Sequence, residues 1–152
     1  MIARAICIFL SLAVVSTAYA TELTEKTVRQ VISKVDHAVN ELSARAVAEQ
    51  LSDNVSITIN ISIQGQKQVM TPSKQEYVSM LEQGWAQYTN YKYSRSNVVI
   101  KIKHDKAYVS AGIQESMTIH DHYLSGASKE EVIIELVNGK PLITEVVGYT
   151  SM

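Results

Sequence analysis

The sequence has almost no cysteine. Its 152 residues include one, Cys7, which lies inside an N-terminal apolar run. If that run is removed by processing, the remaining chain can form no disulfide and can hold no metal through thiolates. The protein must then rely on an ordinary hydrophobic core, which a single domain of this size can build.

An excess of one charge is also missing. The chain has 14 Lys and Arg residues against 15 Asp and Glu residues, and the two signs are interspersed. Nucleic-acid binding usually needs a basic face, so it is disfavoured here. The sequence contains no Gly-rich phosphate loop, nucleophile elbow or zinc-binding helix motif. We therefore predict no cofactor.

The apolar runs are too short to span a membrane, which needs about 20 consecutive apolar residues. Arg4, the apolar stretch 5–15 and the small-x-small site Ala18-Tyr19-Ala20 instead predict a signal peptide over residues 1–20. The alternative is an uncleaved anchor. Cleavage would leave one domain, residues 21–152, in the periplasm or outside the cell, with no stable insertion in the membrane.

Helical spacing of apolar residues appears in three places. It predicts a helix over residues 24–42, a short second helix capped by Ser43, and a third over 73–87. The third begins with a capping box, Ser73-Lys74-Gln75-Glu76. The apolar stripe of the first helix consists of Val28, Val31, Ile32, Val35, Val39 and Leu42.

Alternation of apolar and polar residues predicts strands elsewhere. Asp53-Asn54 should end the second helix, and the first strand should run over 55–63 with a short return over 66–70. After the third helix we expect antiparallel strands to the end of the chain, with a bulge near residues 95–97. These strands cover 90–103, 108–119, 131–137 and 142–150, joined by a turn at 104–106, a loop at 125–128 and a hairpin turn at Asn138-Gly139.

This order of elements resembles that of the nuclear transport factor 2-like superfamily, which includes steroid isomerases, polyketide cyclases and scytalone dehydratase. The resemblance rests on Leu51-Ser-Asp-Asn-Val-Ser-Ile57, Ser73-Lys-Gln-Glu76 and Leu136-Val-Asn-Gly-Lys-Pro-Leu-Ile143. It implies an α+β fold in which helices pack on a strongly curved, mainly antiparallel sheet that forms a cone with a pocket. It also implies frequent homodimers.

The resemblance carries over no active site. The steroid isomerase pattern has a tyrosine on the first helix and an aspartate on the first strand, and neither occurs in this chain. The scytalone dehydratase pattern has two histidines, an aspartate and tyrosines around the pocket. The four histidines here do not align with it. Fold alone does not fix function.

Glu115 is the main candidate for pocket chemistry, because it interrupts the apolar strand face between Ile113 and Met117. A carboxylate in that place must be paired or must line a wet cavity. It could act as a general base, or it could be a structural partner of Arg95. The residues that we expect to line the pocket are Trp85, Tyr88, Tyr91, Tyr93, Glu115 and Met117.

Two further pairs of polar residues are weaker candidates. His120 and His122 should share one face of a strand and could hold a metal with one carboxylate. Asp36-His37 on the first helix either reaches the cone interior or lies on a solvated flank. On the opposite sheet face, small and polar residues would allow a second sheet to approach in a homodimer: Ser110, Gly112, Gln114, Ser116 and Thr118.

Two classes of function remain open. The first is an exported, non-catalytic domain that binds a small apolar or amphipathic molecule, or a protein partner. The second is a small lyase, isomerase or hydrolase that uses Glu115 as its base. A pure dimerisation or secretion-apparatus module is a third option. The absence of a recognisable acid–base constellation favours the first.

Overall fold

The computed structural model describes residues 22–63 and 65–151, so the predicted signal peptide lies outside the described residues. Three helices and six strands follow one another in the order that the sequence predicts. Within the described part, no helix is long and apolar enough to cross a membrane. The elements are α1 (Glu25–Asn40), α2 (Ala44–Ala48), β1 (Leu51–Ile63), β2 (Gln66–Met70), α3 (Lys74–Trp85), β3 (Thr89–Lys103), β4 (Lys106–Ile119), β5 (His122–Val137) and β6 (Lys140–Ser151).

Side-chain caps set the start of each helix. Thr24 caps α1 and accepts a hydrogen bond from the backbone N–H of Thr27, and Ser43 caps α2 in the same way. Ser73 and Glu76 form the capping box of α3, in which each side chain accepts from the other residue's backbone N–H. These bonds satisfy donors that a helix N-terminus otherwise leaves unpaired. The predicted starts of all three helices are confirmed.

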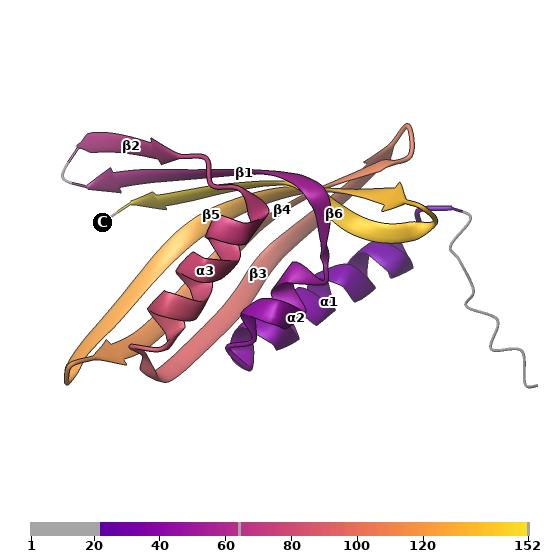
Figure 1. Ribbon diagram of the computed structural model, residues 1–152. Helices are drawn as coiled ribbons and strands as arrows, with labels where there is room; N and C mark the ends of the chain where they lie inside the picture. Colours follow the sequence, from indigo (N-terminus) through magenta and orange to yellow (C-terminus); the bar gives the residue numbers. More distant parts are fainter. Residues whose placement is uncertain (1–21, 64, 152) are drawn as a thin grey trace, which may run out of the picture.

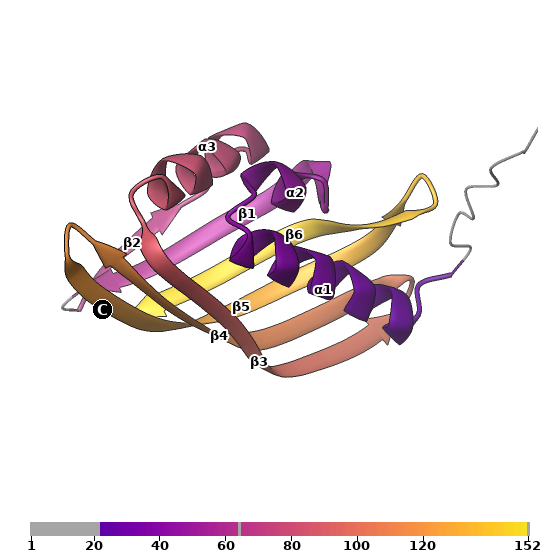
Figure 2. The same ribbon diagram turned by 90° about the horizontal axis from the view of Figure 1, so that it is seen from below.

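The six strands form one curved, unclosed sheet in the order β2-β1-β6-β5-β4-β3. Every neighbouring pair is antiparallel except β1 with β6. All three helices lie on one side of this sheet, and β3, β4 and β5 curl around them (Figures 1 and 2). We call the side toward the helices the inner face and the opposite side the outer face.

Bulges and tight turns shape the curved part of the sheet. The register of β3 against β4 shifts between Ser96 and Val99, which confirms the predicted bulge, and shifts again between Thr89 and Lys92. Asn138 and Gly139 form the predicted hairpin turn, and both have positive φ. Such bulges increase the local twist and bend a strand.

Two predicted boundaries were wrong. Residues 125–128 are not a loop, because β5 already begins at His122 and pairs with β4 from His122 to Glu135. The small residues Ser125-Gly126-Ala127-Ser128 favour a loop by local propensity, but pairing with the neighbouring strand overrides that propensity. Asp53 and Asn54 do not end a helix either, since they lie inside β1, where both are exposed.

The main core lies between α1 and the inner face of the sheet. It is built from the apolar stripe of α1 and from inward residues of β1, β4, β5 and β6, of which Val28, Ala107 and Ile134 are 0% exposed. A second cluster joins the three helices and contains Ala38, Val47 and Trp85. Together the two clusters fix α1 and α3 over the inner face.

Candidate functional site

The inner face of β4 changes from apolar to polar along its length. Ala107, Val109, Ala111 and Ile113 are buried, and Glu115 follows in the same alternation as a half-buried carboxylate. Residues two apart on a strand point to the same face, so Glu115 projects toward the helices. The prediction that Glu115 interrupts an inward-facing strand surface therefore matches its place in the fold.

A buried guanidinium organises the covered part of the inner face. The side chain of Arg95 on β3 is only 3% exposed. Its Nε donates to Asp36 Oδ1 at 2.7 Å, its Nη1 to Glu130 Oε1 at 2.6 Å, and its Nη2 to the Tyr93 hydroxyl at 2.7 Å. The Tyr93 hydroxyl donates in turn to Asp36 at 3.3 Å. We call these four residues the Arg95 cluster.

Burial and charge both act on the ionisable groups of this cluster. Burial by itself would lower the pKa of Arg95, but the carboxylate of Glu130 and the other polar partners hold that pKa above its ordinary value. Burial is the main cause that raises the pKa of Tyr93; Arg95 opposes the rise, and Glu130 and Asp36 add to it. Arg95 therefore stays charged and Tyr93 stays protonated over the physiological range.

The Arg95 cluster overturns one reading of Glu115. Arg95 does not pair with Glu115. Its two carboxylate partners are Asp36 and Glu130. Asp36 thus reaches the interior between α1 and the sheet, whereas its neighbour His37 is exposed. From the sequence, Asp36 could lie either in the interior or on a solvated flank of the helix. Its partner Arg95 is 59 residues away along the chain, so the sequence did not reveal the pair.

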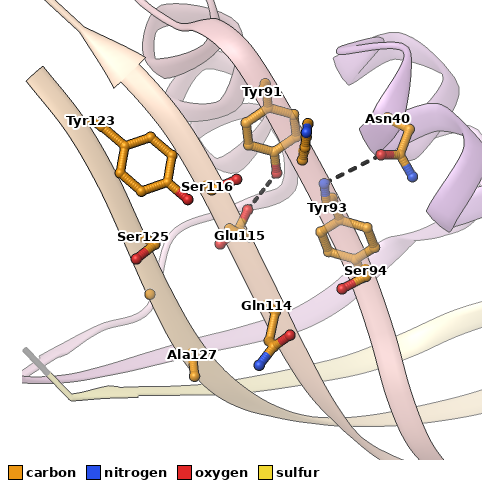
Figure 3. Close-up of a pocket in the computed structure, with 12 residues that line it drawn as sticks. Asn40, Tyr91, Tyr93, Ser94, Gln114, Glu115, Ser116, Tyr123, Ser125 and Ala127 are labelled. Atoms are coloured by element: carbon orange, nitrogen blue, oxygen red, sulfur yellow. Dashed lines mark hydrogen bonds between the residues drawn. The ribbon is translucent and has the colours of Figure 1, made fainter.

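Glu115 has a tyrosine as its partner instead. The Tyr91 hydroxyl, on β3, donates a hydrogen bond to Glu115 Oε1, on β4 (Figure 3). Burial raises the pKa of Tyr91, and the adjacent Glu115 raises it further. Tyr91 is therefore a hydrogen-bond donor at any physiological pH. Among the described residues, no Lys, Arg or His forms an ion pair with Glu115.

Aromatic rings adjoin this hydrogen bond. The rings of Tyr88 and Tyr91 are stacked, with centroids 5.8 Å apart and planes inclined by 19°. Trp85 lies beside Tyr91 at 6.4 Å between centroids, but it is only 8% exposed and belongs to the helical core cluster. Burial and the nearby Glu115 raise the pKa of Tyr88. Tyr88 and Tyr91 thus offer half-buried aromatic surface next to the carboxylate.

Open space adjoins the carboxylate on the other side. Gly126 of β5 is the direct cross-strand partner of Glu115, so both point to the inner face. A Cβ atom placed on Gly126 would meet no atom within 4 Å outside its own chain neighbours. Residues 122–127 of β5 are all exposed, since α3 packs against α2 and β1 rather than over this end. We call Tyr88, Tyr91, Glu115, Met117 and Gly126 the Glu115 site.

The Glu115 site borders a hollow of about 810 Å³ that draws on both faces of the sheet. Tyr91, Glu115 and Gly126 belong to its inner-face lining, and Asn40 closes it at the edge of β3 by accepting from the Tyr93 backbone N–H (Figure 3). Alternation along the strands places the larger share of the lining on the outer face: Lys92, Ser94, Gln114, Ser116, Tyr123, Ser125 and Ala127.

The predicted pairing of His120 with His122 is wrong. β4 ends at Ile119 and β5 begins at His122, so His120 and Asp121 form the two-residue turn between them, both with positive φ. The two histidines therefore do not project side by side from one strand. Within the described residues, no three His, Cys, Asp or Glu side chains gather closely enough to hold a metal ion.

Sequence reasoning missed Gly126, Asn40 and Glu130. Glu130 lies at the same two-residue spacing as Val132 and Ile134 and so shares their strand face. Glu115 shares a face with Ile113 and Ala111 in the same way. That signal was present, but the incorrectly predicted loop before residue 131 hid it. Nothing in the sequence pointed to Asn40, which acts only through its position at the end of α1.

Comparison with known proteins defines the fold. No protein-family model matches the sequence, and no curated protein does. Solved structures do match. A nuclear transport factor 2-like protein from Cytophaga hutchinsonii superposes with a TM-score of 0.65 at 16% identity, over 84% of this chain and 99% of that one.

Two enzyme-like neighbours share the same architecture. A ketosteroid isomerase-like protein from Erwinia carotovora atroseptica gives a TM-score of 0.60 at 14% identity, over 84% of this chain and 98% of that one. A scytalone dehydratase-like protein from Novosphingobium aromaticivorans gives 0.65 at 11% identity, over 84% and 83%. The chain therefore has the nuclear transport factor 2-like α+β cone fold, as its element order predicted. At sequence identities this low, the structural similarity shows a shared fold and nothing about function.

Proposed function

We propose that this is an exported protein that binds a small amphipathic molecule at the Glu115 site without transforming it. One observation carries the proposal. A half-buried carboxylate, held by Tyr91 and flanked by aromatic surface, faces open space instead of a side chain at Gly126. Concave sites with mostly apolar walls and a few fixed polar groups are typical of ligand pockets.

The polar groups at this site are arranged for binding. The Tyr91 hydroxyl already donates its hydrogen bond to Glu115. The raised pKa of Tyr91 also makes it a poor proton donor to a substrate. The Arg95 cluster is internally paired and has no free acid or base to offer. An acid–base pair needs two groups whose protons can both move at working pH.

The test is to fill the open space. Gly126 does not have positive φ, and a Cβ added there has no neighbouring atom within 4 Å. We expect Gly126→Leu to fold normally and to abolish saturable binding of the neutral fluorescent probe N-phenyl-1-naphthylamine. The matched control is Gly148→Leu, because a Cβ at Gly148 is equally unobstructed and Gly148 does not line the hollow. Equal binding by both variants would refute the proposed site.

A small lyase or isomerase is the second candidate, and the Tyr91–Glu115 hydrogen bond is the observation that favours it. In that reading Glu115 removes a proton from carbon, and Tyr91 stabilises the carboxylate between turnovers. Native mass spectrometry of protein purified from its own host would identify a retained ligand. Incubating that ligand in D₂O with wild type and with Glu115→Gln then decides: deuterium uptake only with wild type favours the enzyme.

Export and self-association complete the proposal. N-terminal sequencing of protein from the periplasm or medium should start at Thr21, and a chain that still began at Met1 would contradict export. We also propose a homodimer across the outer face, where large apolar residues are exposed: Val99 by 49%, Tyr108 by 43% and Tyr149 by 43%. Light scattering should give a dimer that Tyr108→Glu dissociates and that Gln30→Glu, exposed on α1, does not.

A further inference from the structure

The inner face carries more negative than positive side chains. Three carboxylates of the described residues, Asp36, Glu115 and Glu130, lie on the inner side of the sheet, and the Arg95 guanidinium forms ion pairs with Asp36 and Glu130. Asp36 and Glu130 are both occupied by Arg95. Within the described residues, the Glu115 carboxylate accepts only from an uncharged group, the Tyr91 hydroxyl. Glu115 is therefore the carboxylate of the three that has no cationic partner, and it lies at the accessible end of the inner face.

The surroundings of Glu115 limit the kind of partner that would neutralise it. Tyr88 and Tyr91 present stacked rings, and the faces of such rings attract cations. An anionic ligand would meet repulsion from the Glu115 carboxylate, which has no cationic partner among the described residues. A neutral ligand can occupy the open space and the aromatic surface, but it leaves the carboxylate without a cationic partner. An organic cation satisfies the rings and the carboxylate at once.

We propose that the Glu115 site binds a small organic ammonium ion, with the charged nitrogen between the Glu115 carboxylate and the rings of Tyr88 and Tyr91. This inference rests on the proposed function and names its ligand class. The ammonium group enters where Gly126 leaves the inner face open. Its apolar substituent lies along Met117, which is half-buried beside Glu115 on the same strand face.

The test compares two molecules of the same shape. Choline carries a quaternary nitrogen, and 3,3-dimethylbutan-1-ol has carbon in that place and no charge. We expect choline to bind at least about tenfold more tightly in calorimetry, since desolvated cation–π contacts and a carboxylate each favour the charged form. Trp85, the single tryptophan of the chain, provides an independent fluorescence signal near Tyr91.

Variants locate the effect. Glu115→Gln should weaken the binding of choline at least about tenfold and leave the binding of 3,3-dimethylbutan-1-ol unchanged, because the substitution removes only the charge. The matched control is Glu131→Gln, which removes the same charge from the outer face, where Glu131 pairs with Lys129 at 2.7 Å. An equal loss in both variants would mean that long-range charge, and not the Glu115 site, attracts the cation.

The outcomes separate this inference from the proposed function. If N-phenyl-1-naphthylamine binds and Gly126→Leu blocks it, while choline binds no better than the alcohol, the site exists and the cation inference is overturned. If neither the neutral probe nor choline binds to folded wild type, the proposed function itself fails. Tyr88→Leu adds a second check, because loss of the ring should weaken choline more than the alcohol.

Discussion

Replacing Arg95 by methionine should destabilise the protein by about 3 kcal/mol. Removing one partner of a buried ion pair typically costs about 3–5 kcal/mol, because the remaining charge stays buried without compensation. Here two carboxylates lose their partner, but the side chains of Asp36 and Glu130 keep 30% and 24% of their surface exposed. Water can reach them, so we expect the lower end of that range. Methionine retains the packing of the arginine stem.

Urea unfolding followed by Trp85 fluorescence would measure this change, and the melting temperature should fall by about 10 °C for a domain of this size. Arg45→Met is the matched control, because the Arg45 side chain is 91% exposed. This substitution removes only a surface ion pair, in which Nε of Arg45 lies 3.5 Å from Oε1 of Glu49. Adding Asp36→Asn and Glu130→Gln to Arg95→Met should recover part of the loss. If Arg95→Met and Arg45→Met unfold within about 0.5 kcal/mol of each other, Arg95 is not the centre of a buried network.

Further predictions concern the helices and the aromatic surface. Trp85→Ala should cost about 3–5 kcal/mol by chemical denaturation, since the ring is 8% exposed, and unchanged stability would place it outside the core. Ser73→Ala should cost about 1 kcal/mol through loss of the α3 cap. Hydrogen bonds from Ser73 lower the pKa of Glu76 from 4.5, so the stabilisation is present above that pH and is lost as the pH falls through the lowered value. Wild type and Ser73→Ala should therefore converge in stability on acidification, and a constant difference would contradict the capping box.

The elements that the sequence predicted well are those fixed by local physics. The capping box at Ser73, the stripe of α1 and the Asn138-Gly139 turn each depend on residues a few positions apart. Residues 122–128 depend instead on pairing with β4, and their serine, glycine and alanine content gave the opposite signal. Local propensity could not reveal a strand that exists only because a long partner strand lies beside it.

The candidate site was predictable in part for the same reason. Alternation placed Glu115 on the inner face, and helical spacing brought Trp85 and Tyr88 near it. The partners could not be read from the chain: Arg95 lies 59 residues from Asp36 and 35 from Glu130, and only the fold joins them. Tyr91 and Glu115 are 24 residues apart and meet because β3 pairs with β4, in a register that sets Tyr93 opposite Glu115 and Tyr91 two residues further along β3.

The contrast between the two polar clusters supports the proposal that a ligand binds at the open end of the sheet. Both put carboxylates on the inner face, where burial disfavours charge. Under α1, that cost is offset by the 3%-exposed guanidinium, so Asp36 and Glu130 serve the structure and offer nothing to a ligand. Beyond α1 and α3 the helices stop, β5 presents Gly126, and Glu115 keeps one neutral hydrogen-bond partner. A carboxylate in that place needs no ion pair for folding, since water can reach it, yet it lies against aromatic rings. Its charge is therefore available to a ligand, and it is the group on which both the binding and the lyase hypotheses depend.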